Sequence, residues 1–179
     1  MADRYTQVMI LCEDFMHLNF VRRYLILRGV ESRRIRGKVA PSGRGSGAQY
    51  VIANYPVEVK ALRSRPHVRA GLVAVVDADT LSVEERFRQL EQSLGQPGRG
   101  DAERIGLLAP KRNIETWMFF LLGNVVNEED DYKKRVFQSN VKETVAAFGN
   151  LCPRKAVEIT VPSIQRACKE FTAFLSRVS

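Results

Sequence analysis

The chain has 179 residues, of which 45% are apolar, and it carries a net charge of +8. This length is typical of one domain with its own hydrophobic core, so we expect a single domain over residues 1–179. No segment approaches the roughly 18 to 20 uninterrupted apolar residues of a membrane span, and the amino-terminal residues lack the charged lead and apolar core of a signal peptide. These absences predict a cytoplasmic protein without a membrane partner.

The first predicted elements are a buried strand that begins near residue 5 and ends near Cys12, and a helix over residues 15–29. Apolar residues recur at helical spacing in the second segment, and a glycine follows them as a terminator: Phe15, Leu18, Val21, Leu25 and Gly29. Residues 32–47, SRRIRGKVAPSGRGSG, predict a basic strand followed by an exposed loop.

A second helix is predicted after Gly47, and we expect Pro56 to kink or restart it. The apolar positions that it presents are Tyr50, Val57 and Ala61. A buried strand follows over residues 71–79, GLVAVVDAD. Ser82 and Glu85 then form a capping box, which predicts a helix over residues 82–94. Its apolar stripe is Val83, Phe87, Leu90 and Leu94.

The strand-and-helix alternation continues with a turn and a strand over residues 104–110, RIGLLAP. Asn113 is expected to cap a helix that presents Ile114, Trp117 and Leu121. Beyond residue 126 the pattern is helical, with one strand-like piece at 156–161 and a last helix that Ser163 caps. The apolar face of that last helix is Ile164, Ala167, Phe171 and Phe174.

Apolar strands that alternate with helices predict an α/β fold, in which helices cover both faces of a mostly parallel, Rossmann-like sheet. The core of this fold spans about residues 6–125, and residues 126–179 form a helical extension. The three cysteines, Cys12, Cys152 and Cys168, are odd in number and lack CxxC spacing. We therefore expect reduced packing residues rather than a disulfide or a zinc site.

The positive charge is concentrated in the first part of the chain. Residues 1–72 hold 13 Lys and Arg against 5 Asp and Glu, whereas residues 73–179 hold 15 of each kind. Arginine suits bidentate contacts with phosphate, so this asymmetry favours a nucleic-acid partner, DNA or RNA. The residues expected to contact it are Arg33, Arg34, Arg36, Arg44 and Arg112. The alternative is a basic surface that serves only solubility.

Candidate catalytic groups follow three of the predicted strands. Glu13 follows the first strand, Asp77 and Asp79 follow a later one, and Lys111, Arg112 and Glu115 follow RIGLLAP. Functional residues of open parallel sheets collect beyond the carboxyl ends of the strands. Carboxylates gathered there suit Mg²⁺ or Mn²⁺. Each residue has a structural alternative as a strand terminator or a helix cap.

Two motifs make this pattern more specific. ILCED, with Glu13 at the end of a strand, and VAVVDAD, with its DxD pair Asp77 and Asp79, resemble the signature motifs of the TOPRIM domain. That family includes topoisomerases, bacterial primases, small nucleases and the nuclease module of OLD-type proteins. The resemblance implies that Glu13, Asp77 and Asp79 hold Mg²⁺ or Mn²⁺ and catalyse phosphodiester hydrolysis.

The chain departs from the family at two points. Asp14 stands where the family often has glycine, and no second domain is evident that would supply a topoisomerase tyrosine or a primase template fold. The resemblance therefore implies a nuclease. The segment PKRNIETW resembles small stand-alone TOPRIM-like proteins encoded beside ATPases in phage-defence loci. That likeness implies an antiviral effector controlled by an ABC- or OLD-type ATPase; the alternative is a non-catalytic module that binds nucleic acid or protein.

Further roles follow if the resemblance holds. Lys111 and Arg112 would contact the phosphate, and Glu115 would hold a second metal ion or orient water. His17 would hydrogen-bond Glu13 or act as an acid or base, and the alternative is a helix-packing or surface histidine. The glycine-rich loop around Arg44 would touch the nucleic-acid backbone. The acidic run Glu128–Asp131 is either a further metal ligand or a solvated face.

Overall fold

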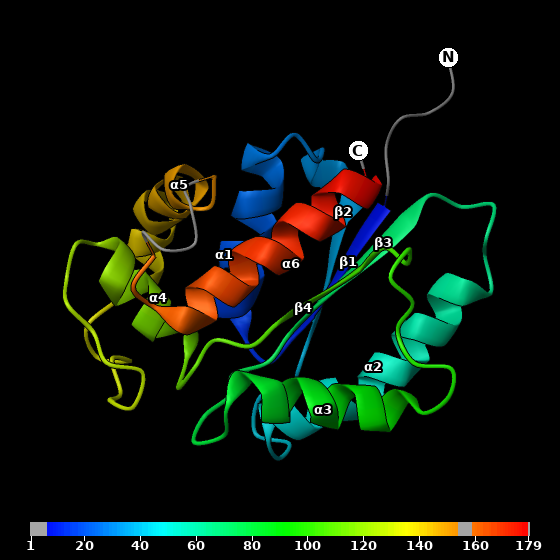
Figure 1. Cartoon of the computed structure of the whole chain (residues 1–179), viewed down its shortest axis with the longest axis horizontal. Coiled ribbons are helices and arrows are strands. Elements are labelled where there is room, and N and C mark those ends of the chain that lie inside the picture. Colours follow the sequence, from blue (N-terminus) through cyan, green and yellow to red (C-terminus); the bar gives the residue numbers. More distant parts are fainter. Residues whose placement is uncertain (1–6, 154–158, 179) are drawn as a thin grey trace.

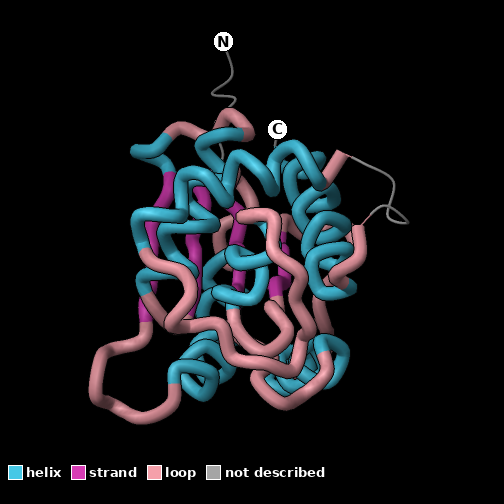
Figure 2. The backbone as a smooth tube through the Cα atoms, turned by 90° about the vertical axis from the view of Figure 1, so that its left-hand side faces the viewer, coloured by secondary structure: helices cyan, strands magenta, loops and turns pink. Residues whose placement is uncertain are grey.

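The computed structural model describes residues 7–153 and 159–178, and it is an α/β fold built on a four-stranded, all-parallel sheet (Figure 1). The strand order is β2-β1-β3-β4. The strands are β1 (Gln7–Cys12), β2 (Ile35–Val39), β3 (Ala70–Val75) and β4 (Ile105–Leu108). The predicted Rossmann-like class is confirmed. Because all strands run the same way, the loops that leave their carboxyl ends gather at one edge of the sheet (Figure 2).

Helices cover both faces of the sheet (Figure 1). One face carries α1 (Phe15–Leu27), α4 (Ile114–Leu121), α5 (Val141–Leu151) and α6 (Pro162–Val178). The other carries α2 (Gly47–Arg63) and α3 (Val83–Leu94). Two short 3-10 turns, η1 (Ser32–Arg34) and η2 (Gln138–Asn140), are the remaining elements of the described residues. Each face has its own hydrophobic core, and β3 contributes buried side chains to both. In the described part of the chain, no helix is long and apolar enough to cross a membrane.

The helix boundaries follow local signals that the sequence carries. Ser82 and Glu85 form the predicted capping box of α3. Asn113 caps α4 as predicted, because its side chain accepts a hydrogen bond from the Thr116 backbone N–H at 3.1 Å. Gly29, just beyond α1, has a φ of +94°, a left-handed backbone that favours glycine. These caps fix where α1 ends and where α3 and α4 begin.

The predicted apolar face of α2 is wrong. Pro56 lies inside one continuous helix and does not restart it. The side chains that α2 buries are Ala48, Val51, Tyr55 and Val59, whereas Val57 is 56% exposed. These four residues recur at intervals of three or four, as on one face of a single helix. A helix that restarted at Pro56 would have presented a different face.

The predicted cap of the last helix is also wrong. α6 begins at Pro162, a residue suited to the first helical position, so Ser163 lies within the helix. The carboxylate of Glu128 accepts a hydrogen bond from the Ser163 backbone N–H at 3.1 Å and therefore does the capping. Ser163 Oγ in turn accepts a bond from Trp117 Nε1 at 2.7 Å. Of the strand-like piece, residues 156–158 lie outside the described residues and 159–161 form no strand.

The prediction of reduced cysteines is wrong for two of the three. Cys152 and Cys168 form a disulfide that joins the end of α5 to α6, with their Cα atoms 5.1 Å apart. Their separation of 16 residues carries no motif. Their proximity arises because α5 and α6 pack on the same face of the sheet. Cys12 is free and buried, as expected.

Candidate metal centre at the carboxyl edge of the sheet

Glu13, His17 and Asp77 converge at the edge of the sheet where the parallel strands end. Each offers one ligand atom, and these atoms lie within 4.8 Å of one another. Parallel pairing places Cys12 beside Val75, so the segments that follow β1 and β3 leave the sheet side by side. The Asp77 backbone N–H donates a hydrogen bond of 2.6 Å to Glu13 Oε1. The sheet topology therefore brings together two of the three carboxylates that the sequence singled out.

His17 links the cluster to the start of α1. Its side chain is fully buried, with Nε2 lying 2.9 Å from Asp77 Oδ1 and Nδ1 lying 2.8 Å from Asp14 Oδ1. The same Asp14 oxygen accepts a bond of 3.0 Å from the His17 backbone N–H, so Asp14 also caps α1. Instead of the predicted hydrogen bond to Glu13, the imidazole bridges two other carboxylates, and its full burial excludes the surface alternative.

The electrostatics of the cluster follow from burial and from its excess of carboxylates. Burial, reinforced by the negative charge of Asp77, raises the pKa of Glu13 to about 7. Burial opposes a charged His17, yet the adjacent Asp77 and Asp14 raise the pKa of its imidazole well above the ordinary value. Burial likewise opposes the Asp14 charge, but the hydrogen bond and the charge of His17 lower the pKa of Asp14 to about 2.

The raised pKa of Glu13 predicts how stability depends on pH. Its folded-state pKa of about 7 lies above the ordinary value of 4.5, so its contribution to stability is complete below pH 4.5 and is lost as the pH rises through about 7. His17, with a raised pKa, changes stability in the same direction at higher pH. We expect the melting temperature in EDTA to fall between about pH 5 and pH 8, and to fall less in Glu13→Gln. Parallel curves for the two proteins would contradict the assignment.

Asp79 lies apart from the cluster. Its carboxylate pairs with Arg86 at 3.2 Å, and its side chain is 54% exposed. β3 ends at Val75, and Asp79 has a φ of +53°, so the two-residue alternation that would align Asp77 with Asp79 does not continue to it. The DxD pair is therefore divided between the buried cluster and a surface ion pair.

The residues that follow β4 are placed differently from one another. Lys111 donates a hydrogen bond of 2.8 Å to the carbonyl of Leu81, so its ammonium is held by the loop after β3. Arg112 is half-buried, has a φ of +67° and forms an isolated backbone bridge with Asp79. Glu115 is buried, and burial followed by the negative charge of Asp77 raises its pKa. Glu115 therefore experiences the negative charge of Asp77, although it does not belong to the group of three possible ligands.

The first residue of α2 leaves room for Glu13. A Cβ added to Gly47 would lie 2.8 Å from Glu13 Cβ and 2.9 Å from its Oε2, closer than side chains tolerate. The same residues border a hollow of about 190 Å³ between the start of α1 and the loop after β2. Its lining is Glu13, Asp14, Phe15, Val39, Ala40, Pro41, Ser42, Gly43, Gly45 and Gly47. A glycine is thus required where the helix approaches the carboxylate.

This close approach predicts the effect of Gly47→Ala. The added methyl must displace the Glu13 side chain, so we expect weaker divalent-metal binding and an intact fold. Alanine alone would favour the helix by roughly 0.5 to 1 kcal/mol, which offsets part of the strain. Calorimetric titration with Mn²⁺ measures the affinity. Gly100→Ala is the matched control, because its Cβ would meet Glu103 only at an ordinary 3.5 Å. Equal affinities for both variants would show that Glu13 does not bind the ion.

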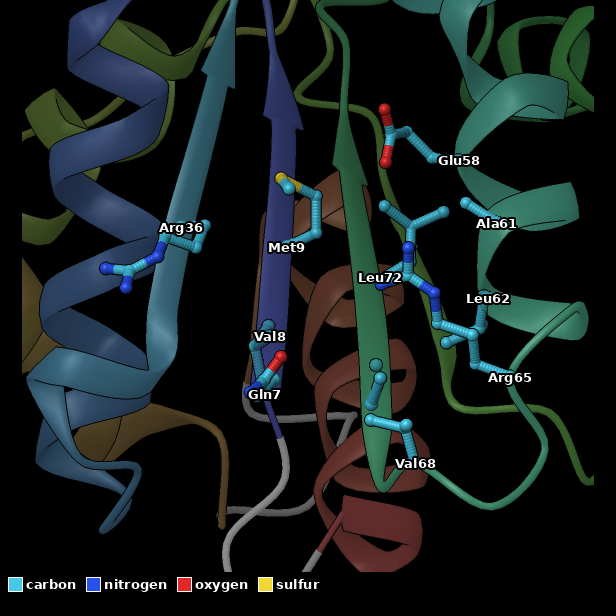
Figure 3. Close-up of a pocket in the computed structure, with 12 residues that line it drawn as sticks. Gln7, Val8, Met9, Arg36, Glu58, Ala61, Leu62, Arg65, Val68 and Leu72 are labelled. Atoms are coloured by element: carbon cyan, nitrogen blue, oxygen red, sulfur yellow. The ribbon is translucent and has the colours of Figure 1, made fainter.

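Most of the predicted basic contacts lie at the other end of the sheet. Arg36 is level with Met9, four residues before Glu13, which is about 13 Å along a strand. Arg33 and Arg34 precede it in η1. Figure 3 shows Arg36 among the residues of an apolar hollow of about 140 Å³ between α2 and the amino-terminal halves of β1 and β3. Two of the predicted contacts lie at the carboxyl edge with the cluster: Arg44 in the loop after β2 and Arg112 in the segment after β4.

The acidic run connects neighbouring elements. Asp131 accepts a hydrogen bond of 2.9 Å from Asn113 Nδ2, Glu129 lies 3.7 Å from Lys111 Nζ, and Glu128 caps α6. Among the described residues, the group of possible ligand atoms includes none of this run. Through these contacts the acidic run connects α4, the loop after β4 and α6.

Two contacts of the predicted site residues were not predicted from the sequence. One is the pairing of His17 with Asp14, for which a helix-capping aspartate three residues before a histidine was the available signal. The other is Arg86, which is buried and holds Asp79 from α3. No protein-family model, curated protein or solved structure matches the chain.

Proposed function

We propose that the chain is a divalent-metal-dependent nuclease of TOPRIM type that hydrolyses phosphodiester bonds in DNA or RNA. The observation that carries the proposal is the convergence of Glu13, His17 and Asp77 at the carboxyl edge of a parallel sheet. Functional residues of open α/β sheets gather at this edge. The TOPRIM-like motifs ILCED and VAVVDAD supply two of these three residues.

The chemistry of the cluster fits a divalent cation. Asp14, Glu13 and Asp77 carry three carboxylates around a single imidazole, and this imbalance contributes to the raised pKa of Glu13. A cation would relieve the repulsion between buried carboxylates. Carboxylate oxygens are ligands that suit Mg²⁺ and Mn²⁺.

Some residues of the cluster would hold a divalent cation, and others orient the side chains that would hold it. A bound divalent cation would polarise the phosphodiester and lower the pKa of a coordinated water. Glu13 and Asp77 would hold that cation. His17 fixes the orientation of the Asp77 carboxylate, and Asp14 fixes the imidazole in turn. Glu115, buried within the field of Asp77, would hold a second metal ion or orient the water.

A cleavage assay tests the proposal. The purified chain is incubated with single-stranded and duplex DNA and RNA in Mg²⁺, in Mn²⁺ or in EDTA. We expect cleavage of at least one substrate in a divalent ion and none in EDTA. Absence of cleavage in every combination would leave the second candidate, a non-catalytic binding module. That candidate is favoured by one observation, the engagement of Asp79 with Arg86 away from the cluster.

The same proposal includes a partner and a biological role. The likeness of PKRNIETW to small TOPRIM-like proteins of phage-defence loci supports an antiviral effector that an ABC- or OLD-type ATPase controls. A nuclease that acts on common nucleic acids needs such restraint. Affinity purification from the native host tests this point. An ATPase recovered in stoichiometric amounts would support it, and a consistently solitary chain would contradict it.

The basic end of the sheet yields a prediction about salt dependence. Replacing Arg33, Arg34 and Arg36 with alanine should weaken binding to all nucleic-acid sequences alike, because phosphate contacts carry no sequence information. The slope of log affinity against log salt should become shallower by about one unit for each lost contact. Fluorescence anisotropy over a series of salt concentrations measures the slope. An unchanged slope would show that these arginines do not face the nucleic acid.

A further inference from the structure

The hollow beside Glu13 is lined by two chemically different kinds of residue. Phe15, Val39 and Pro41 are apolar, whereas Glu13 and Asp14 are acidic. Glu13 also belongs to the candidate metal cluster, so the hollow opens directly beside the position where the proposed function places the reacting phosphate. A group that occupies the hollow would therefore be a neighbour of that phosphate in the substrate.

Phe15 is placed to contact such a group. It is the first residue of α1 and is 64% exposed, whereas α1 buries other side chains in the core: His17, Phe20, Val21, Tyr24 and Leu25. Single exposed apolar residues are ordinary on protein surfaces. Phe15, however, lines the same hollow as a residue of the metal cluster, two positions along the chain from Glu13. Its ring presents an aromatic surface that the core does not use.

The loop after β2, which also lines the hollow, suits a phosphate-linked ligand. It includes Gly43 and Gly45, both with positive φ, and ends at Gly47, where α2 begins. Glycines allow close approach of a ligand to the backbone, and the first turn of a helix presents N–H groups. The exposed Arg44 adds a positive charge between the two glycines. The hollow thus combines an aromatic ring with an open backbone, and Arg44 places a cation in the same loop without lining the hollow itself.

We propose that this hollow binds an unpaired nucleotide next to the reacting phosphate, with the ring of Phe15 stacked on its base, so that the substrate is single-stranded DNA or RNA. The inference rests on the proposed nuclease function and deepens it. In a duplex, neighbouring base pairs cover both faces of each base. Only an unpaired base presents a face to a protein side chain, and stacking on aromatic residues is how single strands are held without sequence preference.

Binding measured in EDTA tests the inference without cleavage. Labelled single strands and a duplex of the same sequence are titrated with wild type, Phe15→Ala, Phe15→Trp and Val57→Ala. We expect wild type to prefer the single strand and Phe15→Ala to bind it about tenfold more weakly. Phe15→Trp should bind as wild type does, because indole also stacks. Val57→Ala, which changes an apolar residue of α2 that is 56% exposed and does not line the hollow, should have no effect.

The outcomes separate this inference from the proposed function. Single-strand binding by Phe15→Ala that equals wild type, or a wild-type preference for duplex, would overturn the stacking assignment alone. If wild type binds single strands through Phe15 but cleaves none of them in Mn²⁺, the nuclease function fails and the stacking assignment stands. A wild-type chain that binds neither form in EDTA would overturn the stacking assignment, whereas the nuclease function is decided separately by the cleavage assay in Mg²⁺ or Mn²⁺.

Discussion

Replacing Asp77 with Asn, or Glu13 with Gln, is expected to lower the cleavage rate by orders of magnitude while the chain remains folded. Both replacements keep the size of the side chain and remove a negative charge that would hold the metal ion. Phosphoryl transfer depends on electrostatic stabilisation, so loss of the ion affects the reaction step itself. Rates with Mn²⁺ and a saturating substrate measure the effect. Asp101→Asn is the matched control, since Asp101 is exposed and lies outside the cluster.

The stabilities of the two metal-free variants should differ. Glu13→Gln removes a buried carboxyl group whose pKa is raised to about 7. The melting temperature of this variant at neutral pH should therefore equal or exceed that of wild type. Asp77→Asn replaces the partner of His17 and should not gain in the same way. Normal cleavage by both variants would show that the cluster is not the active site. Asp79→Asn then tests the DxD pair: cleavage is lost only if Asp79 leaves Arg86 to join the cluster.

Replacing His17 with Ala is expected to lower the free energy of unfolding by about 3 to 5 kcal/mol, the range measured when one member of a buried ion pair is removed. His17 is fully buried between Asp14 and Asp77, and Asp77 is only 4% exposed. Its removal leaves the Asp77 carboxylate without the imidazole and opens a cavity in the first turn of α1. Urea unfolding at neutral pH measures the change.

Two further variants separate the ion pair from simple packing. His67→Ala should have almost no effect, because His67 is exposed and belongs to no element. In His17→Ala combined with Asp77→Asn, the buried charge is gone, so the double variant should be more stable than His17→Ala alone. If His17→Ala and His67→Ala unfold alike, the imidazole does not hold the cluster together.

The features that could be predicted from the sequence are those that depend on neighbouring residues. The capping box at Ser82 and Glu85 and the cap at Asn113 are local hydrogen-bond patterns, and the structure has both. The convergence of Glu13 and Asp77 could also be expected, because parallel strands end at one edge of their sheet. A repeating strand-and-helix order was sufficient to place these two carboxylates together.

The features that could not be predicted depend on contacts between distant segments or on a change in backbone conformation. The Cys152–Cys168 disulfide depends on how α5 packs beside α6. The left-handed backbone of Asp79 separates it from Asp77 although only Ala78 lies between them. His17 contacts Asp77 across 60 residues of sequence, so no spacing rule could have revealed its bridging role.

Calorimetric titration of the chain with Mn²⁺ tests most directly whether Glu13, His17 and Asp77 form a metal centre. Wild type is expected to bind the ion saturably in the micromolar to millimolar range, and affinity should rise with pH through about 7 as Glu13 loses its proton. Glu13→Gln and Asp77→Asn should lose this site, whereas Asp101→Asn should keep it. No saturable binding by wild type at millimolar Mn²⁺ or Mg²⁺, or equal binding by all four proteins, would contradict a metal centre at the carboxyl edge of the sheet.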